Sequence, residues 1–370
     1  MHKKLFIPGP VDVREEILRE MSQPMIGHRS KAASALQKGI SNKLRQLMFT
    51  ENEIILSTSS GSGLMEGAVR SCTTKKAAVF SIGAFGDRWY KMAKANNVPA
   101  DCFKAELGQA TLPEDVDKVL STGDYDLICI THNETATGVM NPVEEIADVM
   151  KKYPDVIWCL DAVSSLGGSK IEVDRLGIDI CITSTQKCLG LPPGLSIASV
   201  SEKAIRNAEK VPFRGLYFDY LELYNYIIEK DYQYPSTPSL SHMFALDRQL
   251  DYILTEGLEN RFERHAMMAQ MVRDWAIQNF ALYSNENYLS NTVTCITNTL
   301  QLSVSKLNEK LGERGYVISN GYGALKDKTF RIAHMADSQP EDICQLLSVI
   351  DEVLVTMVEY LKIVYNSNKA

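Results

Sequence analysis

Short apolar segments alternate with amphipathic segments from about residue 53 to about residue 210. The apolar segments predict strands at residues 53–58, 76–83, 124–133, 156–163, 178–184 and 195–201. The amphipathic segments predict helices at residues 61–72, 85–96 and 142–153, the last with Pro142 in its first turn. Continuous apolar runs are typical of strands that are buried on both faces. The alternation therefore predicts an α/β domain in which helices cover both faces of a parallel sheet.

The pattern changes after residue 211. An aromatic-rich stretch and a Pro/Ser loop at 232–239 lead into a long helical region. The elements predicted after it are strands at 292–297, 316–319 and 330–335 and helices at 303–315 and 340–364. They indicate a smaller α+β domain of roughly 110 residues. We therefore expect an N-terminal segment 1–14 near the functional site and the small domain, a large domain 15–257, and a small domain 258–370.

Composition and charge exclude several classes of protein. With 370 residues, of which 45% are hydrophobic, the chain is long enough for two folded domains. A net charge of −7 gives no electrostatic reason to expect nucleic acid or an anionic membrane as a partner. No run of about 18 apolar residues predicts a membrane-spanning helix. The eight cysteines include no C-x-x-C pair, so we interpret them as reduced core thiols of a cytoplasmic protein.

One lysine, Lys187, follows a predicted buried strand, in the stretch TSTQKCLGLPPG (183–194). Ligands of open α/β sheets bind at the carboxyl ends of the strands. A lysine held there in partly apolar surroundings has a lowered pKa and can attack a carbonyl group to form a Schiff base. The alternative is an ordinary solvated lysine, and Lys187 alone does not decide between the two.

Asp161 also lies at the end of an apolar strand, in VIWCLDAV. A carboxylate in this position needs a partner, because an unpaired buried charge is costly. Asp161 is either a cap for the following turn or a counter-charge to a protonated pyridine nitrogen. Pyridoxal phosphate needs both a Schiff-base lysine and such a carboxylate, so the pair Lys187 and Asp161 indicates this cofactor more strongly than either residue alone.

A Gly/Ser turn, STSSGSGLMEG (57–67), joins the first strand of the large domain to a helix. Small residues let backbone amides approach an anion, and the helix N-terminus adds a favourable dipole. The glycine spacing fits neither the dinucleotide motif nor the Walker motif. The turn is a candidate phosphate cradle, with an ordinary tight turn as the alternative. No metal site is predicted.

Six motifs together give the chain a specific resemblance. They are PGP (8–10), GSG (61–63), THNETATG (131–138), LDAVSSLGG (160–168), TSTQKCLGLPPG (183–194) and FRIAHM (330–335). Their order resembles that of class V, fold-type I pyridoxal-phosphate aminotransferases, and most of all the alanine–glyoxylate and serine–pyruvate aminotransferase group. The resemblance covers nearly the whole chain. It implies a mostly parallel seven-stranded sheet in the large domain, a small α+β domain, and pyridoxal 5'-phosphate as the cofactor.

The resemblance also implies roles for residues around the cofactor. Lys187 would form the Schiff base and then move the proton between the substrate and the cofactor. Asp161 would pair with the pyridine nitrogen, Val163 would pack under the ring, and Phe85 would stack on its other face, where the family often has tryptophan. Further implied contacts to the phosphate or the phenolic oxygen are Ser62, Gly63, Leu64, Gln186 and Thr135.

Two residues of the Pro/Ser loop, Tyr234 and Thr237, match family residues that reach the phosphate in a second subunit. The resemblance therefore implies a homodimer. Arg331 lies inside an apolar strand and needs an anionic partner. The resemblance makes it the clamp on the substrate α-carboxylate, which suits the planar fork of arginine, with the backbone of Gly9 nearby.

The stretch MIGHRSK (25–31) contains His28 and Arg29. Similar stretches occur in alanine–glyoxylate-type enzymes and in phosphoserine aminotransferases, where they help hold the phosphate of the substrate. His28 and Arg29 are therefore candidate substrate-binding residues. The alternative is a turn that caps the next helix, with Ser30 as the cap.

These features together predict a transaminase. It would move an amino group from alanine or serine to glyoxylate or pyruvate by a ping-pong mechanism. The alternatives are phosphoserine aminotransferase and another class V transaminase that uses aspartate or ureidoglycine. A cysteine desulfurase is disfavoured because Cys295 and Cys344 lie in predicted regular elements and not on a mobile loop. A non-enzymatic subunit is disfavoured because Lys187, Asp161 and Arg331 are all present.

Overall fold

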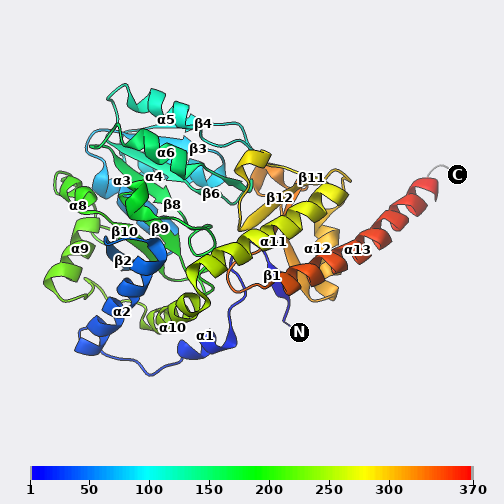
Figure 1. Cartoon of the computed structure of the whole chain (residues 1–370), viewed down its shortest axis with the longest axis horizontal. Coiled ribbons are helices and arrows are strands. Elements are labelled where there is room, and N and C mark those ends of the chain that lie inside the picture. The colour runs from blue at the N-terminus through cyan, green and yellow to red at the C-terminus, as the bar shows by residue number, and fades with distance from the viewer. Residues whose placement is uncertain (1, 368–370) are drawn as a thin grey trace.

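The structure is a computed structural model that describes residues 2–367, with side chains as far as residue 357. Two hydrophobic cores organise the chain, a larger one that contains Trp158 and a smaller one that contains Phe330. Figure 1 shows the larger part around a central sheet and the smaller part beside it, with the last helix extending away from both. The predicted division into a large α/β domain and a small α+β domain stays a prediction, which these two cores suit.

The large part is built on a seven-stranded sheet with the strand order β2-β10-β9-β8-β5-β3-β4. Its strands are β2 (Glu53–Ser57), β3 (Ala77–Ser81), β4 (Ala100–Lys104), β5 (Leu127–Thr131), β8 (Ile157–Asp161), β9 (Ile180–Ser184) and β10 (Ser196–Val200). Only β10 runs against its neighbours, and the pairs β3–β4, β3–β5, β5–β8 and β8–β9 are parallel. The predicted mostly parallel seven-stranded sheet is therefore confirmed.

Helices connect these strands and cover the sheet (Figure 1). They are α1 (Glu15–Glu20), α2 (Lys31–Met48), α3 (Gly61–Cys72), α4 (Ala84–Ala95), α5 (Pro113–Leu120), α6 (Val143–Met150), α7 (Val173–Leu176), α8 (Glu202–Ala208), α9 (Tyr220–Glu229) and α10 (Leu240–Glu256). A short hairpin of β6 (Asn133–Glu134) and β7 (Val139–Met140) follows β5. Pro142 lies at the N-cap of α6, one residue before the first turn in which it was predicted.

The small part has its own five-stranded sheet, in the order β1-β13-β14-β12-β11. Its elements are β1 (Lys4–Phe6), α11 (Leu258–Asn279), β11 (Ala281–Leu282), a 3₁₀ turn (Glu286–Tyr288), β12 (Val293–Thr297), α12 (Val304–Glu313), β13 (Tyr316–Asn320), a second 3₁₀ turn (Gly323–Leu325), β14 (Thr329–Ala333) and α13 (Pro340–Ser367). The N-terminal strand β1 pairs with β13, so the start of the chain belongs to the sheet of the small part.

The helix α11 belongs to both cores. Phe262, near its start, packs in the larger core, whereas Met268 and Trp275 pack in the smaller one. The change from one core to the other thus falls within α11, a few residues beyond the predicted boundary at 257/258. This helix therefore connects the two cores.

The cysteines correct one expectation. Six of the eight are buried, but Cys102 is half-buried and Cys344 is exposed. Cys102 lies on the edge strand β4, and Cys344 lies near the start of α13, so these two thiols are not core residues. In the described part of the chain, no helix is long and apolar enough to cross a bilayer.

Candidate active site

Lys187 and Asp161 lie at the same edge of the large sheet. Asp161 is the last residue of β8, and Lys187 lies just beyond Ser184, the last residue of β9. The two strands are parallel neighbours, with Asp161 in register with Ile182. Because their carboxyl ends meet, the structure brings the two predicted catalytic residues to one place.

The amine of Lys187 is held by the N-terminal segment. Its Nζ donates a hydrogen bond to the carbonyl oxygen of Pro8. A Cβ on Gly9 would lie 2.7 Å from Cδ of Lys187, so glycine is needed for this close approach. Burial disfavours the ammonium form and the charge of Arg331 adds to this effect, so the pKa of Lys187 falls to about 8. Such a lysine is partly neutral near neutral pH, as attack on a carbonyl requires.

Asp161 is only 4% exposed. Its Oδ1 accepts a hydrogen bond from the backbone N–H of Val163 at 2.9 Å. Burial raises the pKa of Asp161 to about 6, against the effects of that hydrogen bond and of the charges on Arg88 and Lys187. A buried carboxylate with this pKa gains from a cationic partner, and a protonated pyridine nitrogen is such a group.

The Gly/Ser turn packs directly against the turn that follows Asp161 at the end of β8. A Cβ on Gly61, the first residue of α3, would lie 2.6 Å from Cγ2 of Val163. The amide of the next glycine, Gly63, donates to the carbonyl oxygen of Ser60 at 2.9 Å. Gly63 also provides space, since a Cβ there would lie 2.6 Å from the ring of Phe218. A contact of Gly63 with the phosphate stays a prediction.

Ser62, in the same turn, holds a positively charged side chain, that of Arg88. Its hydroxyl accepts a hydrogen bond from Nη1 of Arg88 at 3.0 Å. Leu64 is fully buried, and its carbonyl oxygen accepts from the hydroxyl of Tyr220 at 3.1 Å. The candidate phosphate cradle therefore combines the N-terminus of α3, a hydroxyl group and a guanidinium.

A row of two aromatic rings and two arginines runs along the site. Cζ of Arg88 lies 4.8 Å from the ring centroid of Phe85, and the Phe85 ring lies 5.7 Å from that of Tyr322. Cζ of Arg331 lies 5.7 Å from the Tyr322 ring. Because Tyr322 is 40% exposed, it marks the open side of this row. Phe85, predicted to stack on the cofactor, and Arg331, predicted to bind the carboxylate, thus both lie against the ring of Tyr322.

Arg331 lies within β14 and is 7% exposed. Its Nε and Nη2 donate to the carbonyl oxygen of Asn320 at 3.1 and 2.9 Å, and its Nη1 donates to the carbonyl oxygen of Thr135 at 3.0 Å. Burial lowers the pKa of Arg331. Carbonyl oxygens orient the guanidinium without neutralising it, so the charge remains for a carboxylate ligand.

The hairpin β6–β7 fixes several of these groups. The hydroxyl of Thr135 forms a 2.5 Å hydrogen bond with that of Ser164, in the turn after β8. The buried carboxylate of Glu134 accepts from the backbone N–H groups of Phe85 and Gly86, at 2.9 and 3.2 Å. Burial raises the pKa of Glu134 to about 7, despite these hydrogen bonds. Glu134 thus caps α4 and holds the backbone that presents Phe85.

Two buried oxygens near Lys187 have no hydrogen-bond partner within the described residues. They are the hydroxyl of Ser184 and the side-chain oxygen of Gln186. Buried polar groups in proteins are normally paired, so these atoms indicate a polar molecule bound at this edge of the sheet.

The loop expected to reach a second subunit is packed in its own subunit. Tyr234 is 8% exposed and belongs to the larger core, whereas Thr237 is exposed. Of these two residues, Thr237 is available for a contact with another chain. The hydroxyl of Tyr234 has no hydrogen-bond partner within the described residues, and its contact with a second subunit stays a prediction.

Arg29 fastens this loop. Its Nη1 and Nη2 donate to the carbonyl oxygens of Tyr234 and Pro235, at 2.5 and 3.2 Å. His28, beside it, is half-buried. Ser30 caps α2, since its hydroxyl accepts from the N–H of Ala33 at 3.2 Å, as the capping alternative predicted. A role of His28 and Arg29 in binding substrate phosphate stays a prediction.

Sequence reasoning missed three residues of the site. Glu134 lies shortly after β5, so it has a signal like that of Asp161, a charged residue near the end of an apolar strand, whereas Arg88 lies within α4 and has no such signal. Tyr322 lies in the loop between β13 and β14, where no local pattern distinguishes it.

Comparisons with known proteins agree with this geometry. The sequence model of the family Aminotransferase class-V matches residues 13–346. An uncharacterized aminotransferase of Methanocaldococcus jannaschii is 37% identical over 361 residues, which cover 95% of this chain and 92% of that protein. The serine–glyoxylate aminotransferase of Arabidopsis thaliana is 30% identical, with 95% of this chain and 90% of that protein covered. The solved structure of alanine–glyoxylate aminotransferase from Nostoc sp. superposes with a TM-score of 0.89 at 26% identity, covering 96% of each chain.

Proposed function

Because this chain belongs to the class V aminotransferases, which are pyridoxal-phosphate enzymes, we propose that it moves an amino group from alanine or serine to glyoxylate or pyruvate. One observation carries the proposal. A desolvated amine (Lys187), a buried carboxylate (Asp161) and a guanidinium without an acidic partner among its hydrogen bonds (Arg331) converge at one edge of the sheet. The reaction would run as two half-reactions that use the same three groups.

The residues present fit the cofactor. Pyridoxal 5'-phosphate supplies an aldehyde and, when bound, a ring that accepts the electrons of the broken Cα–H bond. Lys187 offers the amine for the aldehyde, and Asp161 offers the negative charge for the pyridine nitrogen. Ser62 and Arg88 offer a hydroxyl and a cation for the phosphate. The unpaired oxygens of Ser184 and Gln186 support a polar ligand at this place.

Each side chain then has a separate task. Arg331 binds the α-carboxylate of the amino acid and so orients its Cα–H bond. With the cofactor bound, Lys187 would be the group that accepts and donates the proton at Cα, for which its lowered pKa is suited. Asp161 would supply the negative charge that favours a protonated pyridine nitrogen. Phe85 and Tyr322 exclude water from one side of the site.

The preference for a small side chain rests on the relatives that act on serine or alanine. The ring of Tyr322, close to both the Arg331 guanidinium and the Phe85 ring, is the group that would face this side chain. A phosphoserine substrate needs free cations for its phosphate. Arg29, the residue predicted for that role, donates to the carbonyl oxygens of Tyr234 and Pro235, which leave its charge unneutralised, so phosphoserine stays an alternative donor.

The cysteines do not support the desulfurase alternative. Cys295 is buried in β12, and burial raises the pKa of its thiol to about 11. A thiol in this state is a poor nucleophile, since the thiolate is the reactive form.

We further propose a cytoplasmic homodimer. The exposed side chains of Phe213, Leu216 and Tyr217 lie near the loop that carries Thr237 in sequence and form apolar surface that a second subunit would cover. Free thiols, six of them buried, suit a reducing compartment.

A panel of donors and acceptors tests the substrate. Alanine, serine, aspartate, phosphoserine and ureidoglycine would each be paired with glyoxylate, pyruvate and 2-oxoglutarate. We expect alanine or serine with glyoxylate to give the highest kcat/KM, by about tenfold or more over the charged donors. Phosphoserine or aspartate as the best donor would contradict the proposed specificity.

A further inference from the structure

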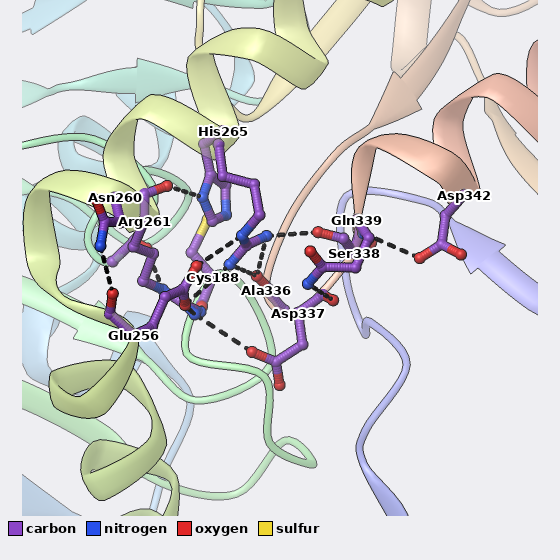
Figure 2. Close-up of polar contacts among 12 residues, drawn as sticks. Cys188, Glu256, Asn260, Arg261, His265, Ala336, Asp337, Ser338, Gln339 and Asp342 are labelled. Carbon is purple, nitrogen blue, oxygen red and sulfur yellow. Dashed lines mark hydrogen bonds and ion pairs between the residues drawn. The ribbon is translucent and has the colours of Figure 1, made fainter.

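Behind the active site, one arginine touches the turns that carry the catalytic groups. Arg261 lies in the first turns of α11, and its side chain is fully buried. Figure 2 shows Arg261 within a cluster in which side chains of α11 face the segment 336–339. This cluster lies outside the set of residues assigned to the cofactor and the substrate.

Two hydrogen bonds join Arg261 to the large domain. Its Nε donates to the carbonyl oxygen of Gly167 at 2.8 Å, and its Nη2 donates to the carbonyl oxygen of Cys188 at 2.7 Å. Gly167 lies in the turn that begins at Asp161, and Cys188 directly follows Lys187. One planar, rigid group therefore fixes the distance between these two turns.

The other side of the guanidinium faces two carboxylates. Nη1 donates to Oε2 of Glu256 at 2.7 Å and to Oδ1 of Asp337 at 3.3 Å. Asp337 lies just beyond β14, the strand that carries Arg331. Burial alone would raise the pKa of Asp337, but the charges of Arg261 and Arg14 outweigh it and hold this pKa below the usual range. Asp337 therefore stays ionised and keeps its link to Arg261.

We propose that Arg261 is a positioning residue that holds the Lys187 turn and the Asp161 turn in register and ties both to the segment after Arg331. The inference rests on the proposed function of Lys187. A buried ion pair adds little net stability compared with well-packed apolar groups, so stability alone is a weak reason for this cluster. Its hydrogen bonds to Gly167 and Cys188 give it a specific task, because small displacements of catalytic groups slow reactions strongly.

Arg264, in the same helix, provides a matched control. Its Nε donates to Oε1 of Glu256 at 2.7 Å, the same carboxylate that pairs with Arg261. Its other N–H groups donate to the carbonyl oxygens of Ala336 and Ser338. Among the residues that the structure describes, Arg264 makes no hydrogen bond to either catalytic turn, so Arg264→Lys perturbs the same ion cluster without removing a bond to Gly167 or Cys188.

The test compares Arg261→Lys and Arg264→Lys in the full chain. Lysine keeps the positive charge for Glu256 and Asp337 but cannot reproduce the fork of donors. In the cofactor-free protein we expect amide hydrogen exchange in segments 162–169 and 185–191 to become about tenfold faster in Arg261→Lys. The same segments should exchange at the wild-type rate in Arg264→Lys. In the holoenzyme, Arg261→Lys should lower kcat about tenfold, with the KM for the amino donor within about twofold.

In Arg261→Lys, an unchanged exchange rate in segments 162–169 and 185–191 would overturn the proposal. An equal acceleration of exchange in every segment of the chain would also overturn it. If Arg261→Lys does not fold, Asp337→Asn replaces it. That variant should speed exchange in 333–339 and raise the donor KM, and wild-type values for both would also refute the coupling. Borohydride reduction of the wild-type holoenzyme separates the proposed function of Lys187 from the proposed positioning role of Arg261. If the cofactor is not fixed to Lys187, the proposed function fails, while the exchange rates still decide whether Arg261 holds the turns.

Discussion

The carbonyl oxygen of Thr135 accepts a 3.0 Å hydrogen bond from Nη1 of Arg331, although the two residues lie 196 positions apart in the chain. Thr135 belongs to the large domain and Arg331 to the small one. The bond therefore places the guanidinium of Arg331, which is proposed to bind the substrate, against the hairpin β6–β7. The same hairpin holds the backbone of Phe85, which is proposed to stack on the cofactor. The site is complete only when the two domains are packed together.

The first prediction concerns Arg331 itself. Arg331→Lys should raise the KM for the amino donor about 30- to 100-fold, because a lysine cannot make a bidentate bond with the α-carboxylate. The value of kcat should fall less than kcat/KM does. Steady-state kinetics with alanine or serine measure both. Arg206→Lys, on the exposed face of α8, is the control and should leave them unchanged. An unaltered KM in Arg331→Lys would show that the carboxylate binds elsewhere.

The second prediction concerns Asp161, whose burial serves function at the expense of stability. Its folded-state pKa of about 6 lies above that of the unfolded chain, so this group destabilises the cofactor-free protein increasingly as pH rises from about 4 to above 6. Asp161→Asn should abolish transamination yet stabilise the cofactor-free protein at pH 8, by on the order of 2–3 kcal/mol. Chemical denaturation measures this difference.

A buried aspartate with good partners provides the control for that experiment. Asp179 accepts a hydrogen bond from the N–H of Trp158 at 2.9 Å and pairs with Lys203 at 2.7 Å. Asp179→Asn should therefore destabilise the protein. If Asp161→Asn destabilises it to the same extent, Asp161 already has a compensating partner in the cofactor-free protein.

The third prediction concerns the pH dependence of cofactor binding. Attack on the aldehyde needs the neutral amine of Lys187, whose pKa is lowered to about 8. The rate at which the cofactor-free enzyme forms its covalent link to pyridoxal 5'-phosphate should rise with pH and level off above about 8. Stopped-flow absorbance measures the rate. A rise that continues toward the ordinary lysine pKa, near 10.4, would mean that Lys187 is solvated.

The fourth prediction concerns Arg88. Its guanidinium bonds to Ser62 and lies over Phe85, so removing the charge should weaken cofactor binding about tenfold or more in Arg88→Gln. Equilibrium dialysis of the cofactor gives the dissociation constant. Lys91→Gln removes the same charge from the exposed side of the same helix and should have no effect. Equal affinity in both variants would remove Arg88 from the phosphate cradle.

Much of the large domain could be predicted because its strands are buried on both faces. In β3, β5, β8 and β9 every residue is buried, and each reads as a continuous apolar run. The edge strand β4 has only one buried residue and gave no such signal. The three-residue strand β1 depends on β13, far away in the chain, so no local pattern could reveal it.

Residues of the site could be predicted where they lie at the ends of buried strands. They could not be predicted where packing between distant parts of the chain brings them together. Lys187 and Asp161 stand just beyond or at the end of buried strands, and their residue types indicate the chemistry. The hydrogen bond from the Gly63 amide to the carbonyl oxygen of Ser60 depends on how the first turn of α3 closes, which the sequence pattern did not indicate. Arg261 could not be predicted, because its partners Gly167 and Cys188 lie 94 and 73 positions away.

A half-reaction tests the central claim most directly. The purified holoenzyme would be mixed with alanine or serine, without any oxo acid. The account predicts loss of the visible absorbance of the lysine-bound cofactor and the release of about one oxo acid per Lys187. Lys187→Ala should do neither. An unchanged spectrum with every donor, or turnover by Lys187→Ala, would contradict the account.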